Sequence, residues 1–239
     1  MTPDDPDLAR AFETTWPAAE YADHGALRSG RGLGAGGRVS STRALSPDWS
    51  AEDIAMAEAR HRDWDQRPMF RLPDSDQRLS EALTARGYRR ETPTAIMAAE
   101  SAALVRAYPA MTTFAIWPAL QIQRDIWAAG NISGARQAVM DRIALPRTTL
   151  LGRIDDRAAA AAFVAVDGEV AMIHAIEVAP QFRRRGMAGW LIARAAEWAA
   201  GHGATRLGLA VSRANTGARA SYDMLGFREI GGYGYWAKD

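Results

Sequence analysis

Between Ala158 and Val178 the chain carries two strand-length apolar segments joined by a short turn signal. The first segment reads AAAAAFVAV and the second reads EVAMIHAIEV, with Asp167-Gly168 between them. An Asp-Gly dipeptide suits a type I′ turn, which joins antiparallel strands. We therefore expect an antiparallel strand pair here.

The residues that follow continue to alternate between helical and extended patterns. Apolar residues recur at helical spacing up to Gly201, and an alternating strand pattern is centred on Leu209. Asn215 can cap a second helix that Gly226 closes, and a last strand ends near Trp236. The order strand, strand, helix, strand, helix, strand predicts an α/β fold with a mixed sheet.

The first hundred residues show a fainter version of this order. GALRSGRG, RVSSTRAL and PMFRL are candidate strands, and Ser50 with Asp53 has the spacing of a capping box that begins a helix. The segment LTARGYRRE around Gly87 resembles the later DMLGFREI. We interpret the likeness as a weak internal duplication and place a domain boundary near residue 100, which gives units 1–100 and 101–239.

Composition excludes several classes of protein. The 239 residues contain 29 Lys plus Arg against 28 Asp plus Glu, so no overall positive charge favours nucleic acid. The absence of cysteine removes disulfides and thiolate zinc sites, and a cytoplasmic location fits best. The N-terminus lacks the apolar segment of a secretory signal, and no apolar run approaches the roughly 20 residues of a membrane helix.

Two glycine-rich segments could bind phosphate. Gly32, Gly34 and Gly37 satisfy G-x-G-x-x-G, but an extended segment follows where a dinucleotide site needs a helix, so we expect a hairpin loop. Arg183 to Gly189 instead lies between a strand and a helix. Free backbone N–H groups and the helix dipole favour an anion at such a helix start.

This second segment resembles a motif of the GNAT superfamily of acetyl-CoA-dependent N-acetyltransferases. Arg183-x-x-Gly186-x-Ala188 is similar to its pyrophosphate motif, and Asn215, Ala218, Tyr222 and Gly226-Phe227 are similar to its downstream pattern. The resemblance covers residues from about 158 to 236. It implies a GNAT-like fold, with the first half as a second, degenerate unit that has no counterpart of the Arg-x-x-Gly-x-Ala motif.

Carried over position by position, the resemblance implies a binding site for acetyl-CoA. The residues implied are Ile176, Val178, Arg183, Arg184, Arg185, Gly186, Met187, Ala188, Gly189, Asn215, Ala218 and Tyr222. The backbone from Arg183 to Gly189 would cradle the pyrophosphate. A backbone N–H near Val178 would polarise the thioester carbonyl.

Tyr222 is the implied general acid, because its counterpart in many family members protonates the departing thiolate. A primary amine with a pKa of about 10.4 is almost wholly protonated at pH 7, so a base is also expected. His174 and Glu177 are the candidates, and strand alternation predicts that they lie on opposite faces. No activated Cys or Ser stands out, which favours direct attack in a ternary complex.

Two functions remain open, acetyl transfer and a non-catalytic CoA-binding or regulatory module with the same fold. The expected partner is a small-molecule amine, and Trp16, Arg28 and Arg38 are candidates for the wall of its cleft. We expect a monomer or homodimer that binds neither nucleic acid nor membrane. His61 and its neighbouring aspartates spread around a helix, so we expect no metal.

Overall fold

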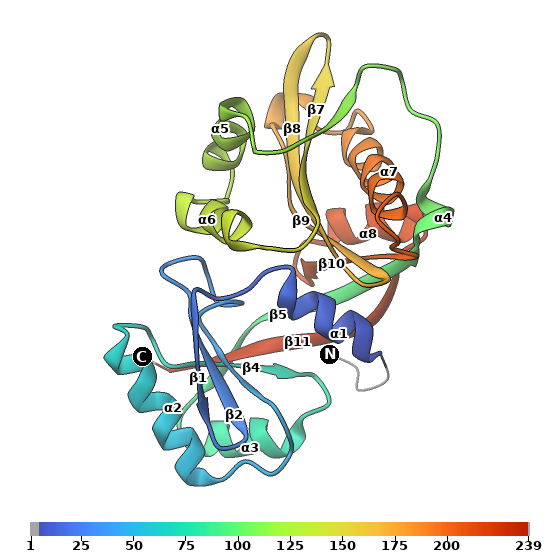
Figure 1. Cartoon of the computed structure of the whole chain (residues 1–239). Coiled ribbons are helices and arrows are strands. Elements are labelled where there is room, and N and C mark those ends of the chain that lie inside the picture. Colours follow the sequence, from blue (N-terminus) through green and yellow to red (C-terminus); the bar gives the residue numbers. More distant parts are fainter. Residues whose placement is uncertain (1–4, 239) are drawn as a thin grey trace.

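A computed structural model describes residues 5–238 of the chain (Figure 1). The elements in chain order are α1 (Pro6–Thr14), β1 (Glu20–His24), β2 (Leu27–Arg31), β3 (Thr42–Ala44), α2 (Ala51–Asp63), β4 (Met69–Pro73), α3 (Gln77–Ala85), β5 (Arg89–Glu100), α4 (Ser101–Leu104), β6 (Thr113–Ile116), α5 (Gln121–Ala129), α6 (Gly134–Arg142), β7 (Arg147–Ile154), β8 (Arg157–Asp167), β9 (Val170–Val178), η1 (Pro180–Phe182), α7 (Met187–Ala200), β10 (Arg206–Ser212), α8 (Thr216–Leu225) and β11 (Arg228–Ala237). The alternation of helices and strands confirms the predicted α/β class.

The strands of the described residues form one mixed sheet that runs through both halves of the chain. Its order is β1-β2-β3-β4-β11-β5-β10-β9-β8-β7-β6. The pairs β3–β4 and β9–β10 are parallel, and the other neighbours are antiparallel. The predicted strand, strand, helix, strand, helix, strand order after residue 158 is present as β8 to β11.

The sheet order has an internal symmetry. Five strands of the first half have a counterpart in the second half, namely β1 and β7, β2 and β8, β3 and β9, β4 and β10, and β5 and β11. If each strand is replaced by its counterpart, the same order of these ten strands results, in the reverse direction. The helices α2 and α3 then correspond to α7 and α8. The chain is therefore built of two tandem units that share one topology.

The two units exchange their last strands. β11, the end of the second unit, lies between β4 and β5, whereas β5, the end of the first unit, lies between β11 and β10 (Figure 1). Each unit therefore completes its sheet with a strand of the other. The predicted division near residue 100 stays a prediction, because the sheet itself continues across it.

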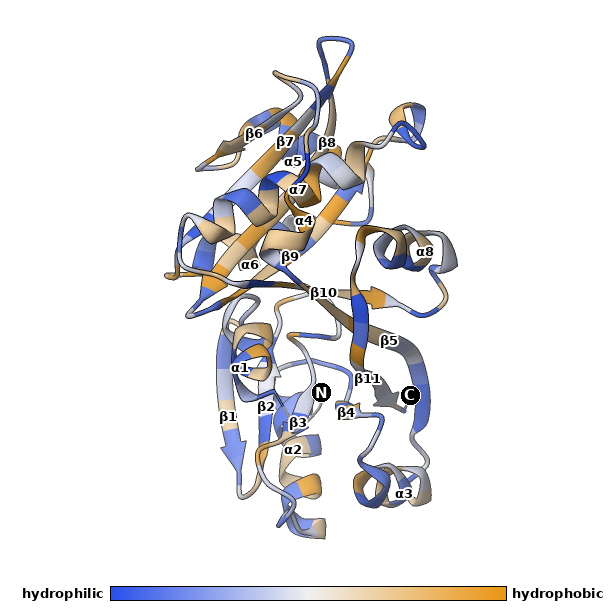
Figure 2. Cartoon of the chain, turned by 90° about the vertical axis from the view of Figure 1, so that its right-hand side faces the viewer, coloured by the Kyte–Doolittle hydropathy of each residue, from blue (hydrophilic) through white to orange (hydrophobic). Residues whose placement is uncertain are grey.

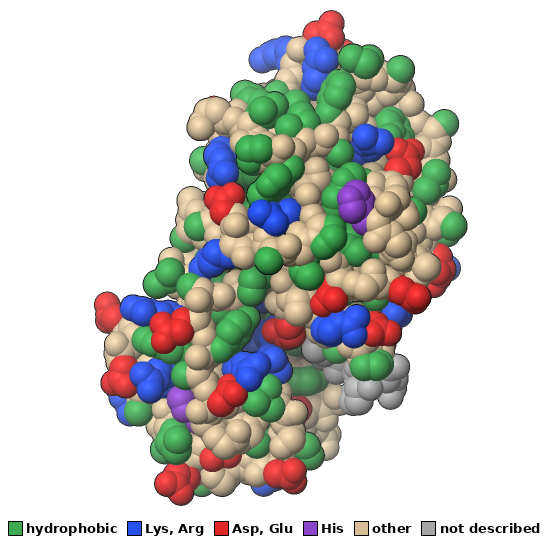
Figure 3. All heavy atoms as spheres, viewed as in Figure 1, with side chains coloured by type: hydrophobic (Ala, Val, Ile, Leu, Met, Phe, Trp, Pro, Cys, Tyr) green, Lys and Arg blue, Asp and Glu red, His purple; other side chains and the backbone are tan. Residues whose placement is uncertain are grey.

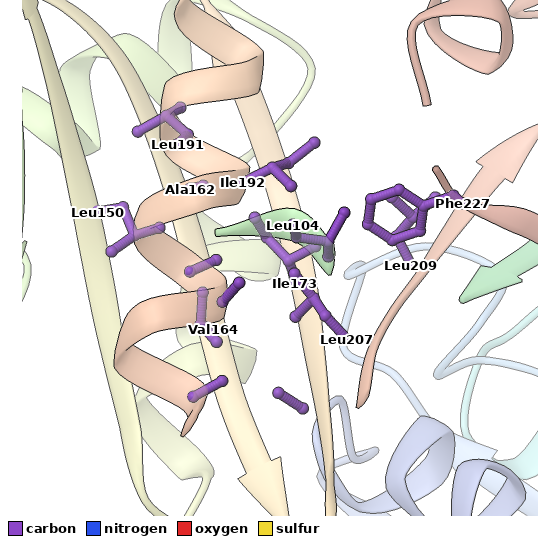
Figure 4. Close-up of a cluster of buried hydrophobic side chains, with 14 of the residues drawn as sticks. Leu104, Leu150, Ala162, Val164, Ile173, Leu191, Ile192, Leu207, Leu209 and Phe227 are labelled. Atoms are coloured by element: carbon purple, nitrogen blue, oxygen red, sulfur yellow. The ribbon is translucent and has the colours of Figure 1, made fainter. Parts of the chain in front are cut away.

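Helices cover both faces of the second unit. α5 and α6 lie on one side of β7, β8 and β9, and α7 lies on the other (Figure 1). Leu191 and Ile192 of α7 pack against Leu150, Val164 and other buried strand residues (Figure 4). β8 is hydrophobic along most of its length, and the loop that joins β7 to it is hydrophilic (Figure 2). The buried sheet explains why its strands read as nearly continuous apolar runs.

The hairpin between β8 and β9 is present, but its turn lies one residue later than predicted. Asp167 still pairs with Val170, so the turn residues are Gly168 and Glu169, with Gly168 at φ 60°. The Asp167 carboxylate accepts a hydrogen bond of 2.6 Å from the Thr14 hydroxyl of α1. This contact with α1, which local pattern does not reveal, holds Asp167 in the strand.

The surface in view has no large patch of charges of one sign. In Figure 3, acidic and basic side chains lie interspersed on the face in view. None of the helices that the structure describes combines the length and apolar character needed to cross a bilayer.

Candidate functional site

A cleft opens where β9 and β10 separate. These parallel strands pair only from Val170–Met172 to Arg206–Gly208, although β9 continues to Val178 and β10 to Ser212. Beyond Met172 the edge of β9 that faces β10 has no strand partner. The cleft has a volume of about 560 Å³ and is lined by residues of both units.

A β-bulge in β9 decides which way its side chains point. Between the pairs Phe163–His174 and Ala161–Glu177, β9 has one residue more than β8, and Ala175 adopts φ 51°. The indole Nε1–H of Trp127 donates a 2.9 Å hydrogen bond to the Ala175 carbonyl. This contact from α5 fixes the bulged residue.

The prediction that His174 and Glu177 lie on opposite faces is wrong. Their cross-strand partners Phe163 and Ala161 share one face, in the core beneath α5 and α6, so His174 and Glu177 also share it. The extra residue of the bulge shifts the alternation of the strand by one. Ile176, in contrast, packs against the core on the α7 side and also lines the cleft.

The start of α7 carries no side-chain cap. Its N-cap is Gly186 at φ 82°, no side chain accepts from the first N–H groups, and the first turn has no acidic residue. Arg184 also has a positive φ of 60°. Met187 is buried and Ala188 and Gly189 are half-buried. The helix therefore presents unpaired N–H donors and a positive dipole end to an anion.

The corresponding helix of the first unit is closed to an anion. Ser50 and Asp53 form a complete capping box at the start of α2, and Glu52 and Asp53 make its first turn acidic. The Ser50 hydroxyl accepts from the Asp53 N–H, the Asp53 carboxylate accepts from the Ser50 N–H, and the two acidic side chains oppose a second negative charge. The contrast supports the view that the first unit is a degenerate copy.

The three arginines of the loop differ in their contacts. Arg183 donates to the Val178 carbonyl at 2.9 Å and to the Glu177 carboxylate at 3.1 Å. Arg185 pairs with Asp155 at 2.8 Å. Arg184 is exposed and makes no ion pair with any residue that the structure describes.

The helix α8 places two further predicted residues near the cleft. Asn215 lines the cleft and caps the helix, with its side chain accepting from the Ala218 N–H at 3.1 Å, so the two roles weighed for it do not conflict. Ala218 and Tyr222 are half-buried against the core of the second unit. Tyr222 also lines the cleft, and burial raises the pKa of its phenol to about 12. It stays protonated across the physiological range.

His174 is buried with both ring nitrogens engaged. Arg38 Nη1 lies 3.3 Å from Nδ1, and the Thr15 hydroxyl lies 3.0 Å from Nε2. Because a guanidinium can only donate, Nδ1 accepts and Nε2 carries the hydrogen. Burial, and then the Arg38 charge, lower the pKa of His174 well below its ordinary value. The imidazole is therefore neutral and held in one tautomer.

Glu177 has a different environment. Its carboxylate pairs with Arg183, and its side chain is 16% exposed. It lies against Gly130 at the end of α5, where a Cβ would come within 2.6 Å of a carboxylate oxygen. Gly130 thus provides the space that the carboxylate occupies.

The first unit contributes part of the cleft wall. Trp16 and Arg38 line it as predicted, whereas Arg28 does not and pairs with Asp23 at 2.6 Å. Tyr233 and Tyr235 of β11 also line it, and sequence reasoning missed them. No local pattern could have found these residues, because the strand exchange brings them there.

His61 and the G-x-G-x-x-G segment do not form a metal site or a dinucleotide motif, although Gly36 and Gly37 line the cleft. His61 is buried on α2 and contacts Thr42 and Gln66, and no cluster of metal-ligating side chains occurs among residues 5–238. The G-x-G-x-x-G segment from Gly32 to Gly37 lies in the loop between the antiparallel strands β2 and β3. The hairpin-loop interpretation is therefore confirmed.

Fold and site together define a tandem GNAT-like protein whose second unit carries the open helix terminus. Residues 119–227 match the model of the acetyltransferase (GNAT) family. This segment of the chain is therefore similar to GNAT acetyltransferase domains. No curated protein sequence matches the chain.

Several solved structures share the fold. A GCN5-related N-acetyltransferase from Kribbella flavida is 20% identical, with a TM-score of 0.71 over 98% of this chain and 93% of that one. A GNAT-family protein from Novosphingobium aromaticivorans is 18% identical, with a TM-score of 0.63 over 98% and 100%. A tandem GNAT protein from the clavulanic acid biosynthesis pathway is 15% identical, with a TM-score of 0.60 over 83% and 74%. At these identities the likeness concerns the fold.

Proposed function

We propose that this protein transfers the acetyl group of acetyl-CoA to a primary amine of a small molecule, by direct attack in a ternary complex. The observation that carries the proposal is the uncapped start of α7 beside the separated strands β9 and β10. A built-in anion site next to an unpaired strand edge suits a ligand with a phosphate end and a long amide-bearing arm.

The residues present fit acetyl-CoA. The N–H groups from Arg183 to Gly189 would hold the pyrophosphate, with Arg184 free to add charge. The unpaired edge of β9 around Ile176 and Val178 would bind the pantetheine arm through backbone hydrogen bonds, and Asn215 and Ala218 would border it. Bound acetyl-CoA would supply the acetyl group as an activated thioester.

Side chains of α8 and β9 would transfer the protons, and of the three candidates Tyr222 and His174 line the cleft. Tyr222, protonated over the whole physiological range, would donate to the departing sulfur. Glu177 is the better candidate base, because it is partly exposed and neither of its oxygens is committed to a buried network. His174 would have to release Arg38 before Nδ1 could accept a proton. Its contacts favour a positioning role.

The test begins with titration of CoA and acetyl-CoA into the protein by calorimetry. We expect binding, followed by CoA release in the presence of a panel of amines. Tyr222→Phe should lower kcat by about 100-fold or more while leaving CoA affinity unchanged. Absence of CoA binding would refute the proposal. CoA binding without turnover of any amine would instead favour a non-catalytic module.

A second comparison separates the two candidate bases. Glu177→Gln and His174→Gln are each assayed with one productive amine at a fixed pH, and CoA affinity is measured in parallel. A fall in kcat of about 100-fold or more at unchanged CoA affinity in Glu177→Gln alone would assign the base to Glu177. The same result in His174→Gln alone would assign it to His174.

A further inference from the structure

The guanidinium of Arg38 lies in the cleft wall without a carboxylate partner. Its Nη2 donates to the Phe12 carbonyl, its Nη1 faces His174 at 3.3 Å, and its plane lies 3.7 Å above the Phe12 ring. The buried Nε has no hydrogen-bond partner among the described residues. Arg38 makes no ion pair within that part of the chain, although it is largely shielded from water.

The charges around Arg38 do not balance. Glu13 accepts a hydrogen bond from Arg71 at 2.5 Å and forms an ion pair with Arg43 at 3.4 Å, so one carboxylate already serves two guanidinium groups. Arg38 adds a third positive charge beside them. Burial, the largest cause, lowers the pKa of Arg38 to about 10, which still leaves it charged at neutral pH. A buried charge is costly unless it is paired.

The open side of the cleft also carries positive charge. Arg136 of α6 lines the cleft, donates to the Asn131 carbonyl at 2.7 Å and makes no ion pair within residues 5–238. The one lining carboxylate, Glu91, is held by Arg67 through contacts of 3.0 and 3.3 Å. The cleft therefore presents two cations and no uncommitted carboxylate among its described lining.

The pyrophosphate of CoA does not account for these cations. The loop from Arg183 to Gly189, where an anion would bind at the start of α7, is not part of the cleft wall that holds Arg38. Arg38 comes instead from the loop between β2 and β3 of the first unit. It lines the cleft together with residues of the second unit.

We propose that the acceptor is an amine that also carries a carboxylate, and that Arg38 binds this carboxylate. The inference rests on the proposed acetyl transfer. The Nη N–H groups of Arg38 that Phe12 and His174 leave free can form the charge-assisted hydrogen bonds that arginine makes with carboxylates. A neutral or purely cationic acceptor would leave the Arg38 charge buried and unpaired.

The experiment compares amino acids with the amines that lack only their carboxylate, such as phenylalanine with phenethylamine and lysine with cadaverine. We expect wild-type kcat/KM to favour the carboxylate-bearing member by at least about tenfold. Arg38→Gln should raise KM for that member by about 10- to 100-fold, and it should raise KM for the decarboxylated partner much less. Arg28→Gln, which removes an arginine outside this cleft, is the matched control.

Three results would overturn the proposal. The decarboxylated amines could be equal or better substrates, Arg38→Gln could affect both members of a pair alike, or amines bearing a phosphate ester could be preferred over those bearing a carboxylate. Melting temperatures of each variant identify loss of folding. If Arg38→Gln does not fold, Arg136→Gln provides the same comparison at the half-exposed cation of the cleft.

A binding measurement keeps this inference separate from the proposed activity. N-acetylphenylalanine and N-acetylphenethylamine are titrated into the protein with and without CoA. Selective binding of the carboxylate product, lost in Arg38→Gln, supports the inference even if no amine is turned over. Equal binding of both products overturns it, whereas failure to bind CoA counts against the proposed function alone.

Discussion

The indole nitrogen of Trp127 lies 2.9 Å from the carbonyl oxygen of Ala175 and donates to it. Trp127 is fully buried on α5, and Ala175 is the bulged residue of β9. One hydrogen bond from outside the sheet therefore holds the irregular point of the strand that borders the cleft.

Trp127→Phe keeps an aromatic ring but removes the donor. We expect a loss of stability of about 1 kcal/mol and a fall in kcat of about tenfold, because the strand beside the acceptor is less well placed. CoA affinity should change little. Steady-state kinetics and urea unfolding measure both effects, and Trp198→Phe, at a partly buried position of α7 beside His202, is the control. An equal loss of kcat in the control would contradict the assignment.

Gly189→Asp gives α7 the acidic first turn that α2 has. A Cβ at Gly189 would meet Leu225 at 3.5 Å, an ordinary contact, so the side chain fits. We expect CoA affinity to fall by about 10- to 100-fold through repulsion, with no loss of stability because an acid suits a helix start. Gly189→Asn has nearly the same shape without the charge. Calorimetric titrations that give the same affinity for both variants would exclude the repulsion.

Deprotonation of Tyr222 should not lower the activity at alkaline pH. Burial raises the pKa of its phenol to about 12, so the proton needed for the leaving sulfur is retained well above pH 9. Deprotonation of the acceptor amine should therefore make kcat/KM rise from pH 7 to pH 10. Initial rates corrected for spontaneous thioester hydrolysis test this. A decline in this interval that disappears in Tyr222→Phe would contradict it.

His61 should make stability fall in mild acid. Its ring is fully buried between Thr42 and Gln66, and burial lowers its pKa from 6.5 to about 4. Because the folded pKa is below the unfolded one, the stabilisation is complete above pH 6.5 and is lost as pH falls towards 4. The full loss is about 3 kcal/mol. Urea unfolding of wild type and His61→Gln at several pH values should give a shallower slope for the variant. Parallel slopes would remove His61 as the cause.

Fragments 1–100 and 101–239 should not fold separately. Without β5, the second fragment would expose strand edges of β10 and β11, and the first would lack β11 beside β4 and β5. Unpaired edges of this kind favour aggregation. Circular dichroism melts of each fragment, and of the two expressed together, provide the measurement. A cooperative melt of fragment 101–239 alone would support two independent domains.

The local parts of this structure could be predicted from sequence. The strand and helix order after Ala158 follows from periodicity, and the caps at Ser50, Asn215 and Gly226 lie where the residue types place them. The open start of α7 is also a local feature, because Gly186 and the absence of acids after it are visible in the sequence. These features depend on residues within one or two turns of each other.

The rest depends on contacts between distant segments. The bulge at Ala175 is held by a hydrogen bond from Trp127, which lies 48 residues earlier. Because of this bulge, Glu177 lies on the same face of β9 as His174, whereas regular alternation predicts opposite faces. The two ring nitrogens of His174 contact Thr15 and Arg38, which belong to the first unit. Periodicity cannot report a partner so far along the chain.

The exchange of β5 and β11 also has a consequence for how the cleft behaves on dilution. Two separate chains that shared their last strands would dissociate as their concentration fell, and a site built from both would be lost. Here the partner is tethered, so its effective concentration is fixed by the covalent chain. The wall that carries Arg38 therefore stays in place however dilute the protein becomes. The first unit, whose helix α2 is capped, thus remains part of the cleft of the second unit at any concentration.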